Sequence, residues 1–121
     1  MRDDPEYLAD LAATALALAD AARPETLTYF RTAPGPDNKD TTGGFDPVTE
    51  GDRAAERAMR AVLARRRPDD AILGEEYGAS AGTTGLTWVL DPIDGTRAYL
   101  AGAPTWGTLI AVSDAEGPIL G

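Results

Sequence analysis

The sequence predicts an α+β or layered α/β domain, in which two helices are followed by a set of short strands. Up to residue 67, apolar residues recur at the helical spacings of three and four. Beyond it, short apolar runs alternate with glycine, proline and aspartate, a pattern typical of strands and turns. With 121 residues, 43% of them hydrophobic, the chain is one domain at most and can bury roughly two-thirds of its surface.

The first helix is predicted over residues 4–22. Asp4 suits the N-cap and Pro5 the first helical position. Pro24 is expected to interrupt or restart this helix, and residues 26–31 are ambiguous, with a second helical turn as one interpretation. The apolar stripe consists of Leu8, Leu11, Ala15, Leu18 and Ala22.

The second helix is predicted from about Glu50 to Arg67. Thr49 and Asp52 have the spacing of a capping box at its start. Arginines 65–67 are interpreted as the solvated end of the helix, where cations suit the dipole, in preference to a phosphate-binding patch. Residues 33–44, rich in proline, glycine, aspartate and threonine, are expected to form a mobile loop.

The remaining chain predicts strands. The run at 88–90 is expected to end at Asp91-Pro92, residues 80–85 to form a polar loop, and residues 114–117 a hairpin turn. Because the last strand reaches the end of the chain, we expect the sequence to be the front part of a longer protein. The four strands are expected at 71–73, 88–90, 108–112 and 118–120.

Composition excludes several classes of function. Eleven Lys and Arg against twenty Asp and Glu give a net charge of −9, which disfavours a nucleic-acid partner. Without cysteine or histidine, the chain cannot itself supply disulfides, Ser-His-Asp catalysis or His-ligated zinc. The longest apolar stretch, 11–19, is too short to span a membrane, and the N-terminus is too acidic for a secretory signal. We therefore expect a cytoplasmic protein without a membrane partner, and its assembly into a homodimer is left open.

Four acidic residues follow the first two predicted strands. Glu75 and Glu76 come after the first, and Asp91 and Asp94 after the second. Carboxylates at the ends of adjacent strands converge at one edge of the sheet, where α/β proteins bind ligands. Such a cluster repels itself unless a cation is present, and Mg²⁺ prefers a few carboxylates with water and phosphate oxygens. The sequence therefore predicts a Mg²⁺ site.

The segment 91–96, Asp-Pro-Ile-Asp-Gly-Thr, is the most informative one. Pro92 stiffens it, Gly95 allows a close approach to a ligand, and Thr96 can begin a helix whose free N–H groups bind phosphate. Alone, an Asp-Gly pair indicates a turn and an N-cap. An EF-hand is excluded because the twelfth position from Asp91 is Gly102, not glutamate. The Asp-x-Asp pattern of haloacid dehalogenase phosphatases is excluded because these aspartates are three apart.

Three segments together resemble the inositol monophosphatase family: 46–52, 74–76 and 88–96, with the sequences Asp-Pro-Val-Thr-Glu-Gly-Asp, Gly-Glu-Glu and Trp-Val-Leu-Asp-Pro-Ile-Asp-Gly-Thr. The stretches 95–99 and 106–110 are more similar to its histidinol-phosphate phosphatase branch. The resemblance implies the N-terminal half of an αβαβα sandwich, with helices followed by a mainly antiparallel sheet. Residues 1–121 would form that portion, and the C-terminal half, with a further aspartate ligand and most of the substrate pocket, is absent.

By this resemblance Glu75, Asp91 and the carbonyl of Ile93 would hold one Mg²⁺, and Asp91 and Asp94 a second. Two such ions activate a water and neutralise the leaving oxygen. Glu76 would lie behind these ligands or reach a third metal.

The resemblance also assigns the remaining site residues. Thr96, hydrogen-bonded to Asp52, would orient the attacking water, although Asp52 also has its capping role. The N–H groups of Gly95 and Thr96 would bind the phosphate, with Arg97 beside them. Lys39 would lie near the third metal, or be a solvated loop charge.

The implied function is Mg²⁺-dependent hydrolysis of a phosphate monoester, with histidinol phosphate of histidine biosynthesis as substrate. Inositol phosphate or a bisphosphorylated nucleotide are alternatives within the class. An acidic cation-binding module without catalysis is the alternative from another class, disfavoured by Thr96, because a passive cation site needs no water-positioning hydroxyl. Residues 1–121 alone are expected to be inactive.

Overall fold

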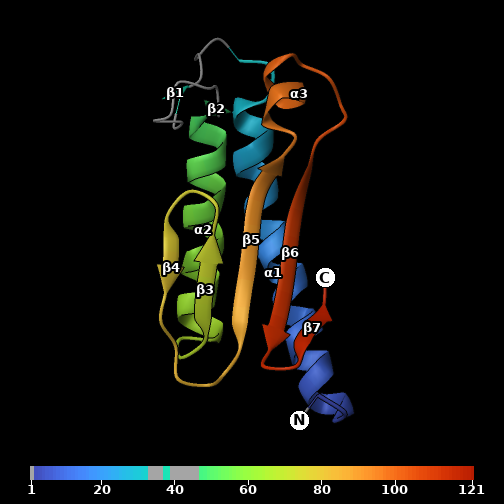
Figure 1. The fold of residues 1–121 in the computed structure, drawn as a ribbon. Helices are drawn as coiled ribbons and strands as arrows, with labels where there is room; N and C mark the ends of the chain where they lie inside the picture. Colours follow the sequence, from blue (N-terminus) through green and yellow to red (C-terminus); the bar gives the residue numbers. More distant parts are fainter. Residues whose placement is uncertain (1, 33–36, 39–46) are drawn as a thin grey trace.

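The computed structural model describes residues 2–32, 37–38 and 47–121. Helices α1 (Pro5–Tyr29) and α2 (Glu50–Arg66) lie side by side in one layer, and a five-stranded sheet forms the second layer (Figure 1). The short strands β1 (Asp37–Asn38) and β2 (Pro47–Val48) pair apart from this sheet, near the start of α2. A single turn of helix, α3 (Thr96–Leu100), connects β5 to the segment that leads into β6.

The sheet has the order β4-β3-β5-β6-β7. Only β3 and β5 run parallel, and the three other neighbouring pairs are antiparallel. The predicted fold, helices followed by a mainly antiparallel sheet, is therefore confirmed. The strands are β3 (Ala71–Gly74), β4 (Gly78–Ser80), β5 (Thr87–Asp94), β6 (Gly107–Asp114) and β7 (Gly117–Leu120).

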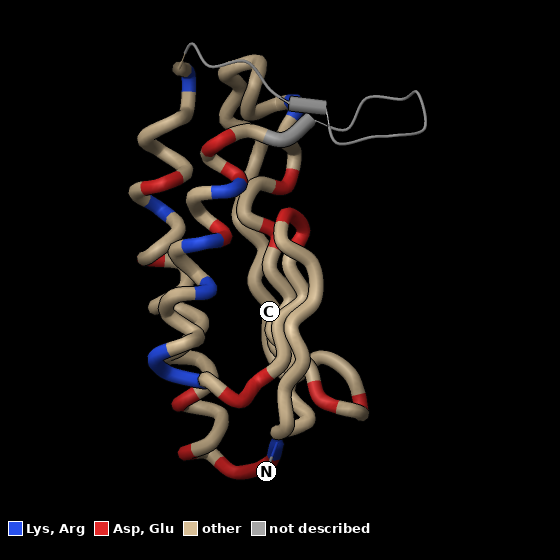
Figure 2. The backbone as a smooth tube through the Cα atoms, turned by 90° about the vertical axis from the view of Figure 1, so that its left-hand side faces the viewer, with Lys and Arg blue, Asp and Glu red and all other residues tan. Residues whose placement is uncertain are grey.

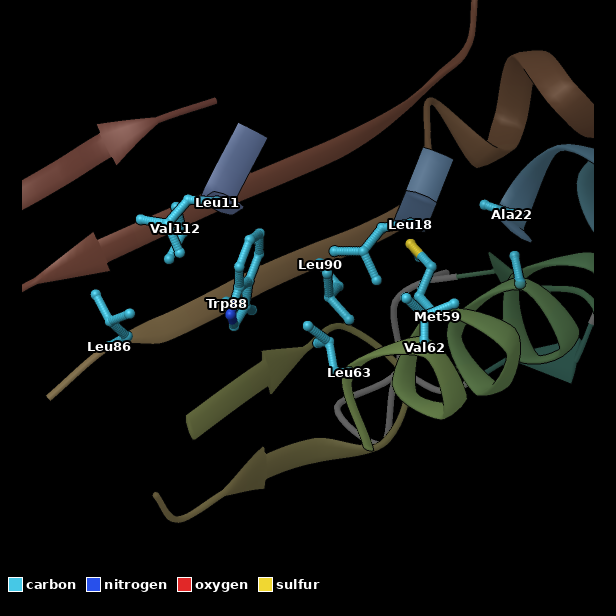
Figure 3. Close-up of a cluster of buried hydrophobic side chains, with 11 residues drawn as sticks. Leu11, Leu18, Ala22, Met59, Val62, Leu63, Leu86, Trp88, Leu90 and Val112 are labelled. Atoms are coloured by element: carbon cyan, nitrogen blue, oxygen red, sulfur yellow. The ribbon is translucent and has the colours of Figure 1, made fainter. Parts of the chain in front are cut away.

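The core lies between the helix layer and one face of the sheet. It joins Leu11 and Leu18 of α1 to Met59 of α2 and to Trp88 and Leu90 of β5, all of them at most 1% exposed (Figure 3). Alternate residues of β5 enter this core, as the twofold periodicity of a strand requires.

The prediction that Pro24 interrupts the first helix is wrong, because α1 continues through it to Tyr29. Pro24 is exposed and lacks only one N–H donor, so the loss is one backbone hydrogen bond on the solvent side. Contacts beyond it hold the last turn. Thr26 is buried, and its carbonyl oxygen accepts a 2.8 Å hydrogen bond from the hydroxyl of Tyr99.

The second helix and its capping box are confirmed. The Asp52 N–H donates to Thr49 Oγ1 at 3.2 Å, and the Thr49 N–H donates to Asp52 Oδ2 at 2.8 Å. Two of the three terminal arginines are exposed. The third, Arg67, is ordered, since it pairs with Asp70 at 2.7 Å and with Asp10 at 3.4 Å.

Asp70 anchors the end of α2 to the sheet. Besides Arg67, it accepts hydrogen bonds from Thr84 Oγ1 at 2.6 Å and from the buried indole N–H of Trp88 at 2.9 Å. Burial alone raises the pKa of Asp70, but these hydrogen bonds outweigh it and hold the pKa below its ordinary value.

The expected strands all form, but two expectations are wrong. First, β5 does not end at Asp91-Pro92 but runs to Asp94. The pairing with β6 shifts register between Asp91 and Asp94, and this irregularity accommodates Pro92, which has no N–H to donate to the ladder. Second, Ser80 belongs to β4, which was not predicted. Of the expected loop 33–44, only Asp37–Asn38 is described, and it pairs as β1.

Within the described residues no helix covers the far face of the sheet (Figure 2), and exposed apolar side chains lie on this face. Leu73 and Val89 are neighbours on this face, and together with Leu109 they are 38–53% exposed. An open groove of about 810 Å³ adjoins it, lined by residues of α1, β5, β6 and β7. Across the described ranges, no helix is both long and apolar enough to cross a membrane.

Candidate active site

The parallel pairing of β3 with β5 brings the first two candidate ligands together. Gly74 is the register partner of Leu90, and the next N–H, that of Glu75, donates to the Leu90 carbonyl at 3.1 Å. Glu75 therefore lies beside Asp91, just past the last pair of the parallel β3–β5 ladder. The sequence prediction placed these acids at one sheet edge for the same geometrical reason.

The donors at this edge suit a hard cation. Carboxylate and carbonyl oxygens are the ligands that Mg²⁺ takes, and Glu75, Asp91 and the carbonyl of Ile93 provide them. Asp94 is exposed and pairs with Gly107 after the register shift. Among the residues that the structure describes, no three acidic side chains lie close enough together to hold a metal ion. The donor set thus fits Mg²⁺ in its chemistry.

Thr96 and Asp52 meet across 44 residues of sequence. The Thr96 hydroxyl lies 3.4 Å from Asp52 Oδ1 and 3.1 Å from the Ile93 carbonyl oxygen. A hydroxyl has one proton, so it donates to one of these acceptors at a time. Asp52 is 1% exposed, and its other oxygen is occupied by Thr49. Asp52 therefore caps α2 with Oδ2 and faces Thr96 with Oδ1.

Gly95 turns the chain from β5 into α3. Its φ of +87° lies in the left-handed region, and a Cβ there would approach the Thr105 carbonyl oxygen to 3.1 Å. Both observations favour glycine. The turn exposes the start of α3, and Arg97 lies exposed on that helix.

An aromatic cluster fixes α3 against α1. The ring centroids of Tyr99, Phe30 and Trp106 lie 5.1–5.4 Å apart. Burial raises the pKa of Tyr99 to about 12, with a further contribution from the negative charge of Asp52. Trp106 precedes β6 and packs in this cluster.

Glu76 is half-buried, and its N–H donates to the carboxylate of Glu56 at 2.8 Å. Lys39 lies outside the described residues. Sequence reasoning missed Glu56, which is fully buried. The available signal was its position: Asp52, Glu56 and Met59 follow one another at spacings of four and three, so Glu56 is an acid within the buried stripe of α2.

Comparisons with known proteins agree with this arrangement. A profile of the inositol monophosphatase family matches residues 7–121. Among curated relatives, a histidinol-phosphatase from Streptomyces coelicolor is 47% identical over 113 residues, covering 93% of this chain and 41% of the relative. One from Mycobacterium tuberculosis is 44% identical, covering 88% and 41%.

Solved structures show the same fold. An inositol monophosphatase from Zymomonas mobilis is 42% identical with a TM-score of 0.67, covering 88% of this chain and 39% of that one. The extragenic suppressor protein SuhB from Bartonella henselae is 26% identical with a TM-score of 0.75, covering 91% and 41%. The chain thus spans about two fifths of the length of the relatives that it matches.

Proposed function

Because the chain belongs to the inositol monophosphatase family, we propose that it forms the metal-binding portion of a Mg²⁺-dependent phosphomonoesterase. The observation that carries this proposal is the position of Glu75 beside Asp91, just past the end of the parallel β3–β5 ladder. Residues 1–121 correspond to the N-terminal portion of such an enzyme, and a C-terminal portion supplies the remaining ligand and most of the substrate pocket.

Within this portion, Glu75, Asp91 and the Ile93 carbonyl hold one Mg²⁺, and Asp91 with Asp94 hold a second. When bound, the ions supply an activated water and neutralise charge on the leaving oxygen. Glu76 stands behind these ligands or reaches a third ion. Two observations support this assignment: the donors are carboxylate and carbonyl oxygens, and the acids follow the last pair of the β3–β5 ladder.

Thr96 and Asp52 orient the attacking water. The 3.4 Å contact between Thr96 Oγ1 and Asp52 Oδ1 supports this role, because a hydroxyl that donates to a buried carboxylate presents its lone pairs to a water. The N–H groups of Gly95 and Thr96, with Arg97 on the same helix, bind the phosphate, since the first N–H groups of a helix have no partner within it.

Histidinol phosphate is the proposed substrate, which would place the enzyme in histidine biosynthesis. Two histidinol-phosphatases at 47% and 44% identity support this choice. Inositol phosphate is the second candidate, favoured by an inositol-1-monophosphatase of Mycobacterium tuberculosis at 40% identity. The cytoplasmic location and the absence of nucleic-acid and membrane partners stay predictions from the sequence, and a homodimer stays open.

A chimaera tests the proposal, with residues 1–121 followed by the remaining part of the Streptomyces coelicolor relative. We expect Mg²⁺-dependent release of phosphate from histidinol phosphate, with a higher kcat/KM than for inositol 1-phosphate. A chimaera that folds and binds Mg²⁺ but releases no phosphate from any small ester would contradict catalysis and favour the cation-binding module. An equal or reversed substrate preference would contradict the histidinol phosphate assignment alone.

A further inference from the structure

Glu56 is a buried acid for which neither the capping of α2 nor the core provides a reason. Its side chain is 0% exposed, in a helix whose other buried side chains are apolar except for Asp52, one turn before it. A carboxylate in such a place must be compensated by hydrogen bonds or by an opposite charge, because its desolvation is unfavourable.

The compensation comes mostly from the turn that follows β3. Glu56 Oε1 accepts the N–H of Glu76 at 2.8 Å, and Oε2 accepts the N–H of Tyr77 at 2.9 Å. Arg60, one turn further along α2, donates from Nε to Oε2 at 3.0 Å. The same arginine also reaches Ser80 Oγ at 3.0 Å.

Together with β5, these bonds fix three successive N–H groups. The N–H of Glu75 donates to Leu90 in the sheet, and the N–H groups of Glu76 and Tyr77 donate to Glu56. Gly74 belongs to the same arrangement, because a Cβ at this position would overlap the Glu56 carboxylate. The backbone that carries Glu75 is thus held from the sheet on one side and from α2 on the other.

We propose that Glu56 is a positioning residue for the cation site: its carboxylate holds the 75–77 turn so that Glu75 stays beside Asp91. This inference rests on the proposed function. It adds a residue that touches neither the ion nor the substrate. The competing explanation is a buried ion pair with Arg60 that stabilises α2 and β4 without affecting the cation.

Glu56→Gln tests the proposal with little change in shape. A carboxamide has one acceptor oxygen, so in either orientation its NH₂ group faces one of the two backbone donors. Gly74→Ala is the second variant, since it displaces the carboxylate without removing its charge. Val62→Ala, a buried core position on the same helix, is the matched control for loss of stability without contact with the turn.

Two readouts on the 121-residue chain separate positioning from stability. Amide hydrogen exchange reports the turn directly, and the free Mn²⁺ signal in electron paramagnetic resonance reports affinity for a cation with similar ligand preferences. In both Glu56→Gln and Gly74→Ala, we expect faster exchange at Glu76 and Tyr77. We also expect Mn²⁺ affinity to fall about tenfold, as for other residues that orient metal ligands. Val62→Ala should leave both unchanged.

Each other outcome has a defined meaning. If the wild-type chain binds Mn²⁺ and Glu56→Gln binds it equally well, the positioning role is overturned and the proposed function stands. The role is also overturned if Val62→Ala weakens Mn²⁺ binding as much as Glu56→Gln, because stability would then explain both. If the wild-type residues 1–121 bind no Mn²⁺ either alone or within the chimaera, the cation site of the proposed function fails, and the positioning role fails with it.

Discussion

Thr96→Val separates the chemical from the structural role of one hydroxyl. The substitution keeps the branched shape and removes Oγ1, which makes a 3.1 Å hydrogen bond to the Ile93 carbonyl and a 3.4 Å contact with Asp52. The bond to Ile93 stabilises the folded chain by about 1 kcal/mol, and the longer contact adds little. We therefore expect the free energy of unfolding to fall by at most about 1 kcal/mol.

The expected effect on the reaction is much larger. Loss of a water-orienting proton acceptor lowers kcat about 10²–10⁴-fold, which corresponds to about 3–5 kcal/mol of transition-state stabilisation. Cation affinity should stay unchanged, because Thr96 holds no charge. The assay is kcat of the chimaera on histidinol phosphate at saturating Mg²⁺, together with thermal unfolding and Mn²⁺ binding of the same samples.

Thr108→Val is the matched control for this experiment. Thr108 Oγ1 donates to the Pro92 carbonyl at 2.8 Å, so this substitution also removes a threonine hydroxyl bonded to the 92–93 backbone. It should lower stability at least as much as Thr96→Val and leave kcat within a few-fold. Equal losses of kcat in both variants, or a Thr96→Val enzyme with normal kcat, would refute the water-orienting role.

Four further outcomes are expected. Asp91→Asn should abolish activity of the chimaera and leave its fold intact, because the proposed site uses this carboxylate for both ions; normal turnover with full Mg²⁺ affinity would remove it from the site. Asp70→Ala should lower the free energy of unfolding by about 1–3 kcal/mol or more, since it leaves the buried N–H of Trp88 without an acceptor. Because the pKa of Asp70 is lowered in the folded chain, the free energy of unfolding of the wild type should fall as pH drops below the ordinary aspartate range. Urea titrations at several pH values should find a smaller fall in Asp70→Ala. Tyr99, with a raised pKa of about 12, binds its proton more tightly when folded, so stability should fall between about pH 10 and 12 and Tyr99→Phe should remove this dependence. The isolated chain should bind Mg²⁺ weakly, release negligible phosphate and associate in sedimentation through its apolar sheet face, so rapid turnover by a soluble monomer would contradict the need for a second portion.

Local rules were sufficient where the deciding contacts lie within a few residues. Thr49 and Asp52 satisfy each other within one helical turn, so their spacing alone predicts the capping box. The position of Glu75 beside Asp91 was also accessible, because the residues that follow the last pair of a parallel ladder lie side by side.

The predictions from sequence that were wrong concern segments whose structure depends on contacts with residues far away in the chain. A proline inside a helix favours a break, but the hydroxyl of Tyr99 donates to the carbonyl of Thr26, 73 residues earlier, and holds the turn beyond Pro24. Likewise the Asp91-Pro92 pair indicates the end of a strand, and only the shifted pairing with β6 carries β5 to Asp94. The role of Glu56 depends on backbone donors twenty residues further along, which a helical periodicity cannot reveal.

The distance between the proposed ligands Glu75 and Asp91 does not depend on how many residues connect β3 to β5. Residues 75–86 pass through the edge strand β4, while the position of Glu75 relative to Asp91 is set by the ladder from Ala71–Thr87 to Gly74–Leu90 and, by our proposal, by the bonds from the 75–77 turn to Glu56. Ser80 and Ala81 are exposed, whereas a side chain at Gly82 would overlap the 69–71 backbone. Extra residues between Ser80 and Gly82 would thus lengthen the excursion without altering the spacing of the acids, so relatives can diverge here and a reporter peptide can be inserted here.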